Sequence, residues 1–439
     1  MLIIYTHSLT PRVKYIFKQI FSEILGIEIS FCLDKKEFQK TSLPKLSYSH
    51  SPIDNELFFQ CHELLFEKGI IERNINVFNY NNLSCFFSVN NSVFPFDPFA
   101  ASFFMISRYE EYLPHIKDIH GRFEAKESLA FKNNFLERPI VDIWINLIKK
   151  ELEKKYPKLF FPKKKFQFIS SIDVDSAYLY KEKGIVRTII SSIADLILFN
   201  YHNLSKRFKV LFGFESDPFD TFNKILATSK KYNIHTIFFF LLGDYNKYDK
   251  SISFSSKIFQ SLIKSVNDHV LVGIHPSVRS LSKKKLLKIE IERLQKIIHK
   301  NILNSRQHYI KLDMPNMYKN LLNSSIKNDY SMGFASMPGF RSGTCNSYFF
   351  YDLDLELETD LKIHPFIVMD VTLKNYLNLD PKDAISKIYN LINEVKYVNG
   401  TFTSVWHNQS LFFENDWQDW HSVYENMIKY VSNLKDEQF

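Results

Sequence analysis

The sequence predicts an α/β protein whose C-terminal part is a barrel of seven strands alternating with helices, preceded by a smaller α/β domain. The first observation is a recurrence of short apolar runs, at residues 166–173, 236–242, 269–274, 302–308, 329–335, 366–371 and 402–407. The second is that segments with the 3.6-residue apolar spacing of helices lie between most of these runs. Strands that alternate with helices favour a parallel sheet. Seven of them suggest closure into a barrel, with an open doubly wound sheet as the alternative.

The length of 439 residues favours two domains over one core. Residues 1–160 mix short predicted strands and helices. They end in a lysine-rich stretch, residues 149–165, where Pro157 and Pro162 are typical of a helix end followed by a linker. We therefore predict one domain over residues 1–160 and a second over residues 161–439.

The composition favours a folded protein without a nucleic-acid partner. The chain is 45% hydrophobic, and 56 Lys and Arg against 48 Asp and Glu give a net charge of +8. These basic residues are scattered apart from residues 149–165, so no nucleic-acid role is predicted. The four cysteines are far apart and indicate reduced, mostly buried thiols. No apolar run has the length of a signal-peptide core or a membrane span, and a cytoplasmic location is expected.

Residues 185–199 form the longest apolar stretch, which Arg187 and Asp195 interrupt. Isoleucines recur in it at every fourth position from Ile185 to Ile197, the spacing of an amphipathic helix. We predict that this helix packs its apolar face on the core. Peripheral contact with a membrane surface is the lesser alternative.

Two aspartates, Asp173 and Asp175, close the first strand of the second domain. Residues i and i+2 of a strand point to the same face, and two carboxylates there repel unless a cation or a shared proton relieves them. Reactive residues also close four of the other predicted strands: His275, Arg306 with His308, Asp370 and His407. The carboxyl ends of barrel strands form one rim, where active sites are built. The sequence therefore predicts a site at this rim.

Five short motifs resemble, in this order, those of the polysaccharide deacetylase family, the fourth family of carbohydrate esterases. They are SSIDVDS at 170–176, GIHPSVRS at 273–280, SRQH at 305–308, GFRSGT at 339–344 and VWHN at 405–408. The resemblance implies a deformed seven-stranded barrel. Residues 94–123 resemble the signature of an uncharacterised accessory domain that precedes the deacetylase-like domain in a bacterial branch often associated with surface-polysaccharide loci.

The resemblance also implies a divalent metal, with zinc as the expected ion, and a role for each rim residue. Asp173 would be the general base, Asp175 and His275 metal ligands, and His407 the general acid.

Three further residues would support this site. Arg306 or Arg341 could hold Asp173 ionised by a charge-assisted hydrogen bond. Asp370 could orient His407 as a carboxylate does for a catalytic imidazole.

One departure from the family pattern concerns the metal. The family usually has a second histidine four residues after the first, and here Arg279 stands at that place. A guanidinium has no lone pair for a metal and would repel one. We predict that His308 supplies the third ligand, because consecutive parallel strands are usually neighbours. Weak metal binding is the alternative, and His308 could instead only hydrogen-bond a carboxylate such as that of Asp175.

The predicted function is removal of an N-acetyl group from a sugar of a surface polysaccharide or glycan precursor, either lipid-linked or nucleotide-linked. A catalytically silent carbohydrate-binding or assembly protein on the same scaffold is the alternative from another class. A glycoside hydrolase ranks last, since Asp173 and Asp175 are too close in sequence to flank a glycosidic bond easily. In the N-terminal domain, residues 107–112 are predicted to make an interdomain contact. The cluster of Asp118, His120 and Arg122 is left unassigned.

Overall fold

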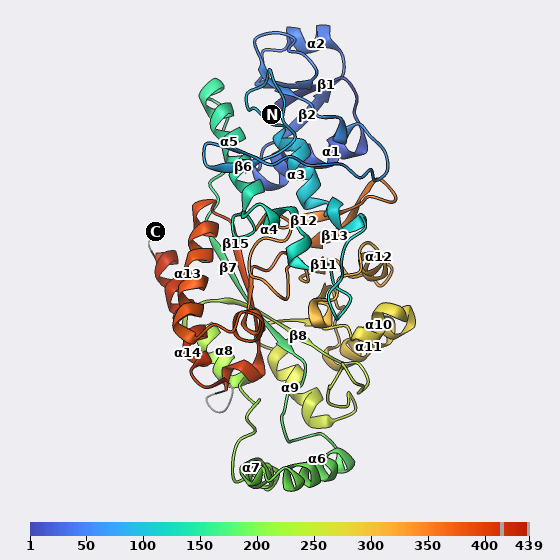
Figure 1. The fold of residues 1–439 in the computed structure, drawn as a ribbon, viewed down its shortest axis with the longest axis vertical. Helices are drawn as coiled ribbons and strands as arrows, with labels where there is room; N and C mark the ends of the chain where they lie inside the picture. The colour runs from blue at the N-terminus through green and yellow to red at the C-terminus, as the bar shows by residue number, and fades with distance from the viewer. Residues whose placement is uncertain (413–416, 437–439) are drawn as a thin grey trace.

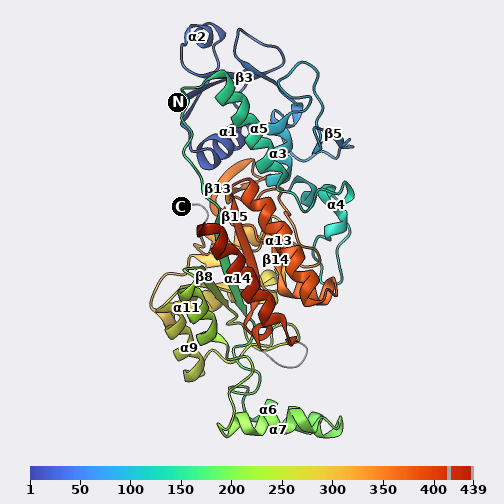
Figure 2. The ribbon, with the colours of Figure 1, turned by 90° about the vertical axis from the view of Figure 1, so that its left-hand side faces the viewer.

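The computed structural model describes residues 1–412 and 417–436. The molecule is elongated, with a small sheet near one end and a larger sheet in the middle (Figure 1). Figure 2 shows the same order from the side, with helices α13 (Pro381–Tyr397) and α14 (Trp420–Asp436) covering one face of the large sheet.

The small sheet has four parallel strands in the order β2-β1-β3-β4. Its strands are β1 (Leu2–Thr6), β2 (Ile29–Cys32), β3 (Lys45–Ser49) and β4 (Leu57–Gln60). The longer helices of this part are α1 (Pro11–Phe17), its π-helical continuation η1 (Lys18–Ile24), α3 (Pro98–Ile106) and α5 (Ile140–Lys155). Helix α3 begins where Asp97 accepts hydrogen bonds from two backbone N–H groups and Pro98 takes the first helical position.

The large sheet has nine strands in the order β12-β13-β11-β10-β9-β8-β7-β15-β14, and all neighbours are parallel except β12 with β13. Its strands are β7 (Gln167–Val174), β8 (His235–Phe240), β9 (Leu271–Ile274), β10 (Asn304–Ser305), β11 (Asn328–Asp329), β12 (Tyr348–Asp352), β13 (Leu357–Ile363), β14 (Val368–Met369) and β15 (Thr401–His407). Its helices are α8 (Phe222–Lys231), α9 (Lys257–Asn267), α10 (Val278–Ser282), α11 (Lys284–Ile298), α12 (Asn316–Leu322), α13 and α14.

All seven apolar runs of the sequence contribute strands to this sheet, so the predicted α/β class is confirmed. The expected barrel is met only in part. The strand ladder is open. A backbone hydrogen bond, 2.9 Å long, joins Met332 O, just after the short strand β11, to Phe366 N, just before the short strand β14. The outcome is a large, mostly parallel sheet.

The two sheets are joined by buried polar contacts and one continuous apolar core. The residue 107–112 segment makes the contact predicted for it: Arg108 donates to the carbonyl of Arg341, and Glu111 accepts two hydrogen bonds from the Arg341 guanidinium. Asp142 on α5 accepts from Thr344 and from the backbone N–H of Cys345. The boundary at residue 160 stays a prediction.

Residues 185–211 form a helical hairpin, α6 (Ile185–Ile197) and α7 (Tyr201–Leu211), that stands away from the body at the end opposite the small sheet (Figure 1). The helix predicted from the isoleucine spacing is present, but core packing was the wrong expectation for its apolar face. None of the α6 residues is buried, and Ile193 and Ile197 are 52% and 68% exposed. The reason is that the polar side of the hairpin faces the body. Among the described residues, no helix combines the length and hydropathy that crossing a bilayer requires.

A candidate metal centre and its pocket

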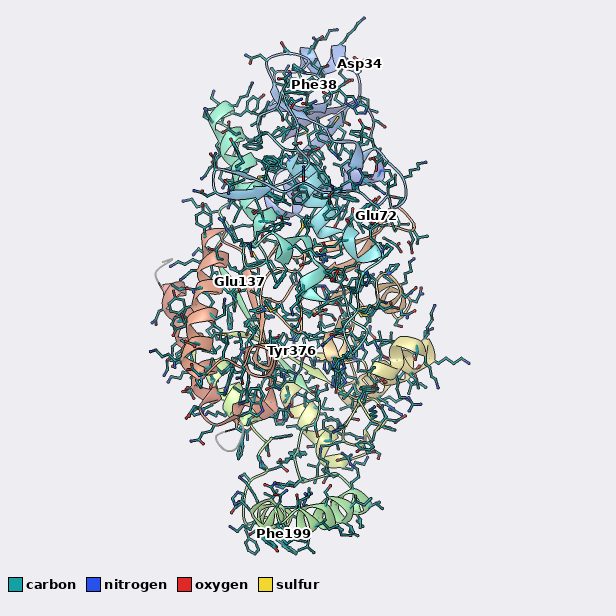
Figure 3. All side chains as sticks on the ribbon, in the orientation of Figure 1. Asp34, Phe38, Glu72, Glu137, Phe199 and Tyr376 are labelled. Carbon is teal, nitrogen blue, oxygen red and sulfur yellow. The ribbon has the colours of Figure 1, made fainter. Side chains whose placement is uncertain are left out.

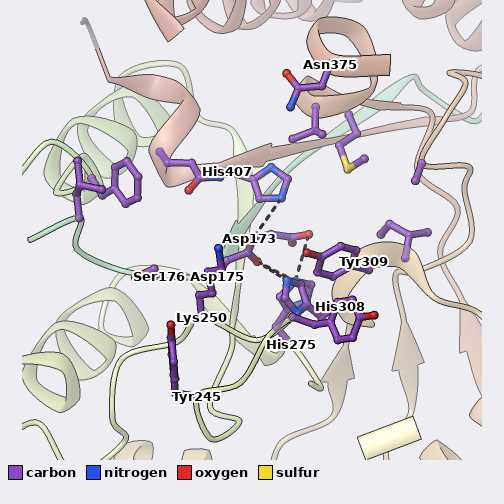
Figure 4. Close-up of a pocket in the computed structure, with 18 of the residues that line it drawn as sticks. Asp173, Asp175, Ser176, Tyr245, Lys250, His275, His308, Tyr309, Asn375 and His407 are labelled. Atoms are coloured by element: carbon purple, nitrogen blue, oxygen red, sulfur yellow. Dashed lines mark ion pairs between the residues drawn. The ribbon is translucent and has the colours of Figure 1, made fainter. Parts of the chain in front are cut away.

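The site lies at the carboxyl ends of neighbouring strands of the large sheet, as predicted. The pairing of Ser305 on β10 with Ile274 on β9 places His308 beside His275, with ring centroids 5.0 Å apart. On the other side of β7, the register pairs His407 with Asp173. Figure 4 shows His275 and His308 on one side of Asp175, and His407 on the other.

Three side chains, those of Asp175, His275 and His308, have ligating atoms within 4.8 Å of one another and could hold a metal ion. Asp175 Oδ1 lies 3.3 Å from His275 Nε2 and 3.4 Å from His308 Nε2. A tetrahedral metal with bonds of about 2.0–2.1 Å has ligand atoms about 3.3–3.4 Å apart. Asp175 Oδ1 is also buried and has no well-formed hydrogen bond, as expected of an atom reserved for a cation. These residues therefore fit a metal.

The other ring nitrogen of each histidine is held by the protein. His275 Nδ1 lies 2.5 Å from the carbonyl oxygen of Arg306, and His308 Nδ1 lies 2.8 Å from Asp249 Oδ1. These acceptors leave the Nε2 atoms without protons in the neutral rings and aim them at Asp175, the arrangement found around metal-bound histidines. Asp249, which is fully buried, was missed by sequence reasoning because it lies in the loop after β8 rather than at a strand end.

The charged groups around His308 and Asp175 favour a positive charge between these two side chains. Burial lowers the pKa of His308, but the carboxylates of Asp175 and Asp249 outweigh burial and raise this pKa to about 9. The pKa of Asp175 lies well below its usual value, because the neighbouring histidines outweigh the effect of burial. Surroundings that favour a proton on His308 Nε2 also favour a metal cation there, and metal binding would release that proton.

His407 faces Asp175 from the opposite side. Its Nδ1 lies 2.8 Å from Asp370 Oδ1, and its Nε2 lies 3.9 Å from Asp175 Oδ2. Burial lowers the pKa of His407, but Asp370 and the two site aspartates raise it to about 10. These carboxylates favour a proton on the His407 ring, which lines the pocket.

Asp173 is paired with Arg306, one of the two arginines predicted for it. Arg306 Nη1 lies 3.1 Å from Asp173 Oδ1 and 2.7 Å from Ser171 Oγ, and the guanidinium is buried against the ring of Phe239. The prediction of Arg341 for this place is not met. The Arg341 guanidinium is committed to Glu111 and to the carbonyl of Gly333, because the GFRSGT loop docks on the N-terminal part of the chain.

A pocket of about 740 Å³ contains this centre, and its lining includes Asp173, Asp175, His275, His308 and His407. The N-terminal part of the chain contributes Arg122, whose Nη1 donates to the carbonyl of Tyr309 at 2.9 Å. This gives the previously unassigned Arg122 a place in the pocket wall. Arg279, the residue at the missing histidine position, is exposed and does not line the pocket.

Comparisons with known proteins find one family model and several distant structural likenesses. A family model described as "Family of unknown function (DUF7033)" matches residues 2–157. No curated protein matches the chain. A structure described as a "putative polysaccharide deacetylase" from Mycobacterium smegmatis is 14% identical, with a TM-score of 0.41, over 62% of this chain and 86% of that one.

Two further solved structures are similar. A polysaccharide deacetylase from Bacillus cereus is 12% identical, with a TM-score of 0.31, over 62% of this chain and 88% of that one. A CE4 family pseudoenzyme from Bacillus anthracis is 10% identical, with a TM-score of 0.33, over 63% of each chain. All three TM-scores lie below 0.5, so none of these likenesses bears on the reaction.

Proposed function

We propose that this protein is a metal-dependent hydrolase that removes an N-acetyl group from a sugar of a glycan or glycan precursor. The observation that carries the proposal is the arrangement around Asp175. Two histidines with held Nδ1 atoms face it from one side, and a histidine paired with a carboxylate faces it from the other. The pocket above them has the volume of a small-molecule site.

Asp175, His275 and His308 would hold the metal, and zinc suits two imidazoles with one carboxylate. When bound, the metal supplies Lewis acidity toward the acyl carbonyl and toward the attacking water. The fold brings these ligands together without the second histidine of the usual HxxxH pattern. His308 supports this proposal, because it offers a third ligand where the second histidine of that pattern is missing.

The remaining residues divide the proton transfers between them. Asp173, whose negative charge Arg306 stabilises, accepts a proton from the attacking water as general base. His407, protonated and held by Asp370, donates a proton to the leaving nitrogen as general acid. The two proton transfers are assigned to two different side chains, so neither group has to perform both.

The proposal is tested by acetate release from a panel of N-acetylated oligosaccharides, with O-acetylated ones beside them. Asp173→Asn keeps the side chain's shape, so metal content and fold should be retained while turnover falls about 10²–10⁴-fold. Asp360→Asn, at an exposed side chain on strand β13, is the matched control. Asp173→Asn turnover equal to wild type would remove the mechanism. Zinc-loaded wild-type protein that releases no acetate from any member would favour the silent scaffold.

A cytoplasmic location stays a prediction, and so does the absence of a nucleic-acid partner.

A further inference from the structure

The hairpin of α6 and α7 turns its apolar side away from the protein. Many large apolar side chains of the hairpin and of the residues just after it are more than half exposed, among them Ile189, Ile193, Ile197, Phe199, Phe212 and Phe214. Phe199, at the turn between the two helices, lies at the end of the molecule opposite Asp34 and Phe38 of the small-sheet end (Figure 3). Figures 1 and 2 agree that the two helices lie side by side in one layer across this end.

Specific contacts fix this orientation. Asp195 on α6 pairs with Arg207 on α7 at 2.5 Å, and both side chains are nearly buried. Arg187 donates to the carbonyl of Ser251 at 3.1 Å, and its guanidinium lies 3.9 Å from the Tyr245 ring centroid. The Asp195–Arg207 pair lies within the hairpin and holds α6 against α7. Turning the apolar side inward would break the contacts of Arg187 with Ser251 and Tyr245, so these contacts hold the apolar face outward.

The base of the hairpin is also tied. The Asp217 carboxylate, just after α7, accepts hydrogen bonds from the backbone N–H groups of residues 179–181, just before α6. Helix α8 begins only at Phe222, so Asp217 does not cap that helix. Asp217 closes the hairpin instead.

The charge of the hairpin favours an anionic lipid surface over a second copy of the chain. Residues 181–215 contain six Lys or Arg against three Asp or Glu. Asp195 is the only acidic residue from 183 to 214, and it faces Arg207. Aromatic side chains cluster at the turn and after α7, as in helices that lie in a membrane interface. Two copies meeting through this face would bring together two hairpins of net positive charge, which opposes association.

The hairpin also borders the catalytic pocket. Arg187, Ile190, Ser191 and Arg207 of the hairpin line the same cavity as Asp173 and His407. Lys183 and Lys250 add cationic lining, suited to an anionic linkage between a sugar and its lipid. We propose that the hairpin docks on an anionic membrane surface and that the pocket receives a glycan anchored in that membrane. The first half stands on the hairpin alone, and the second rests on the proposed function.

The membrane half is tested with the full chain and vesicles of phosphatidylcholine with about 30% phosphatidylglycerol, by flotation at low and high salt. Wild type should float, less so at high salt because screening weakens the charge attraction. Ile193→Glu/Ile197→Glu removes two apolar contacts from the membrane and should weaken binding about 100-fold or more. Ile258→Glu, an exposed isoleucine on α9, is the matched control and should bind like wild type.

Light scattering of the same proteins without lipid decides between membrane and self-association. A wild-type dimer that the double variant converts to monomers, with no flotation, would overturn the proposal. So would equal flotation of wild type and the double variant.

The proposal that the pocket receives a membrane-anchored glycan is tested by measuring acetate release from two substrates. One is an N-acetylglucosaminyl lipid in these vesicles, and the other is a soluble N-acetylated oligosaccharide. The double variant should lose at least about tenfold on the vesicle substrate and keep its soluble rate, because only delivery to the pocket is changed. An equal loss on both would overturn this half. Asp173→Asn should float like wild type. If it does and no protein releases acetate, the proposed function fails while membrane docking stands.

Discussion

Two parallel sheets in this chain each gather histidines at their carboxyl ends, but the surroundings differ. In the large sheet, Asp175, His275 and His308 converge, and each imidazole has a protein acceptor on its far nitrogen. In the small sheet, a second cluster follows β1, β3 and β4: His7, His50 and Cys61 also have ligating atoms within 4.8 Å of one another.

The difference lies in charge and in burial. The small-sheet cluster has two exposed histidines, and burial with the nearby Asp97 raises the pKa of the Cys61 thiol to about 12. Burial and the neighbouring His50 lower the pKa of His7, whereas carboxylates raise that of His308. A thiol binds metal as the thiolate. The carboxyl ends of parallel strands readily bring together side chains that can ligate a metal. The carboxylates and hydrogen-bond acceptors around those side chains decide whether a cation is favoured there.

The largest expected effect is the loss of His275. His275→Ala removes a ligand that burial and the Arg306 carbonyl hold in place, and zinc affinity should fall by more than the 10–100-fold typical of outer-shell losses. Competition with a chromogenic chelator measures this. Unchanged affinity would place the metal elsewhere in the chain.

The next largest effect is expected from His308, which we propose as the replacement for the missing histidine. His308→Ala should approach the loss of His275→Ala, since it also removes one of three ligands. His308→Gln should bind zinc more tightly than His308→Ala, because its amide oxygen can still coordinate the cation, although more weakly than an imidazole does. If both variants bind zinc like wild type while His275→Ala does not, the third ligand is another residue, and His308 only hydrogen-bonds Asp175.

A smaller effect is expected from the residue that positions His308. Asp249→Asn keeps an acceptor for His308 Nδ1–H and removes the charge, so zinc affinity should fall about tenfold, the lower end for such partners. The nitrogen chemical shifts of the His308 ring should show a shift in tautomer. A purely structural role for Asp249 would leave those shifts unchanged while lowering the melting temperature.

The residues of the site and the hairpin differ in how far the sequence could predict them. The alternation of strands and helices, together with the reactive residues at strand ends, was enough to predict that one rim gathers five residues: Asp173, Asp175, His275, His308 and His407. Asp249 could not be found, since a loop position carries no periodicity. The pattern of isoleucines gave the helix α6 and its apolar side, but periodicity does not say which side faces the body. For that, the contacts of Arg187 with Ser251 and Tyr245 were needed. Arg306 and Arg341 could not be told apart either, because the partner of Arg341 is Glu111, 230 residues away in the chain.

The smallest effect is expected in the small sheet. Cys61→Ser removes the buried thiol that lies 3.6 Å from His50 Nδ1, and a serine hydroxyl is a poor zinc ligand. If charge and burial decide metal binding, zinc stoichiometry should stay at one ion per chain in both wild type and this variant. The Cys61 thiol is protonated near neutral pH, and no carboxylate is among the three candidate ligands of this cluster. Metal analysis after exhaustive dialysis measures the stoichiometry, and His7→Ala serves as a second probe of the same cluster. Two zinc ions in wild type, falling to one in Cys61→Ser, would show that converging side chains bind metal even without acceptors behind them.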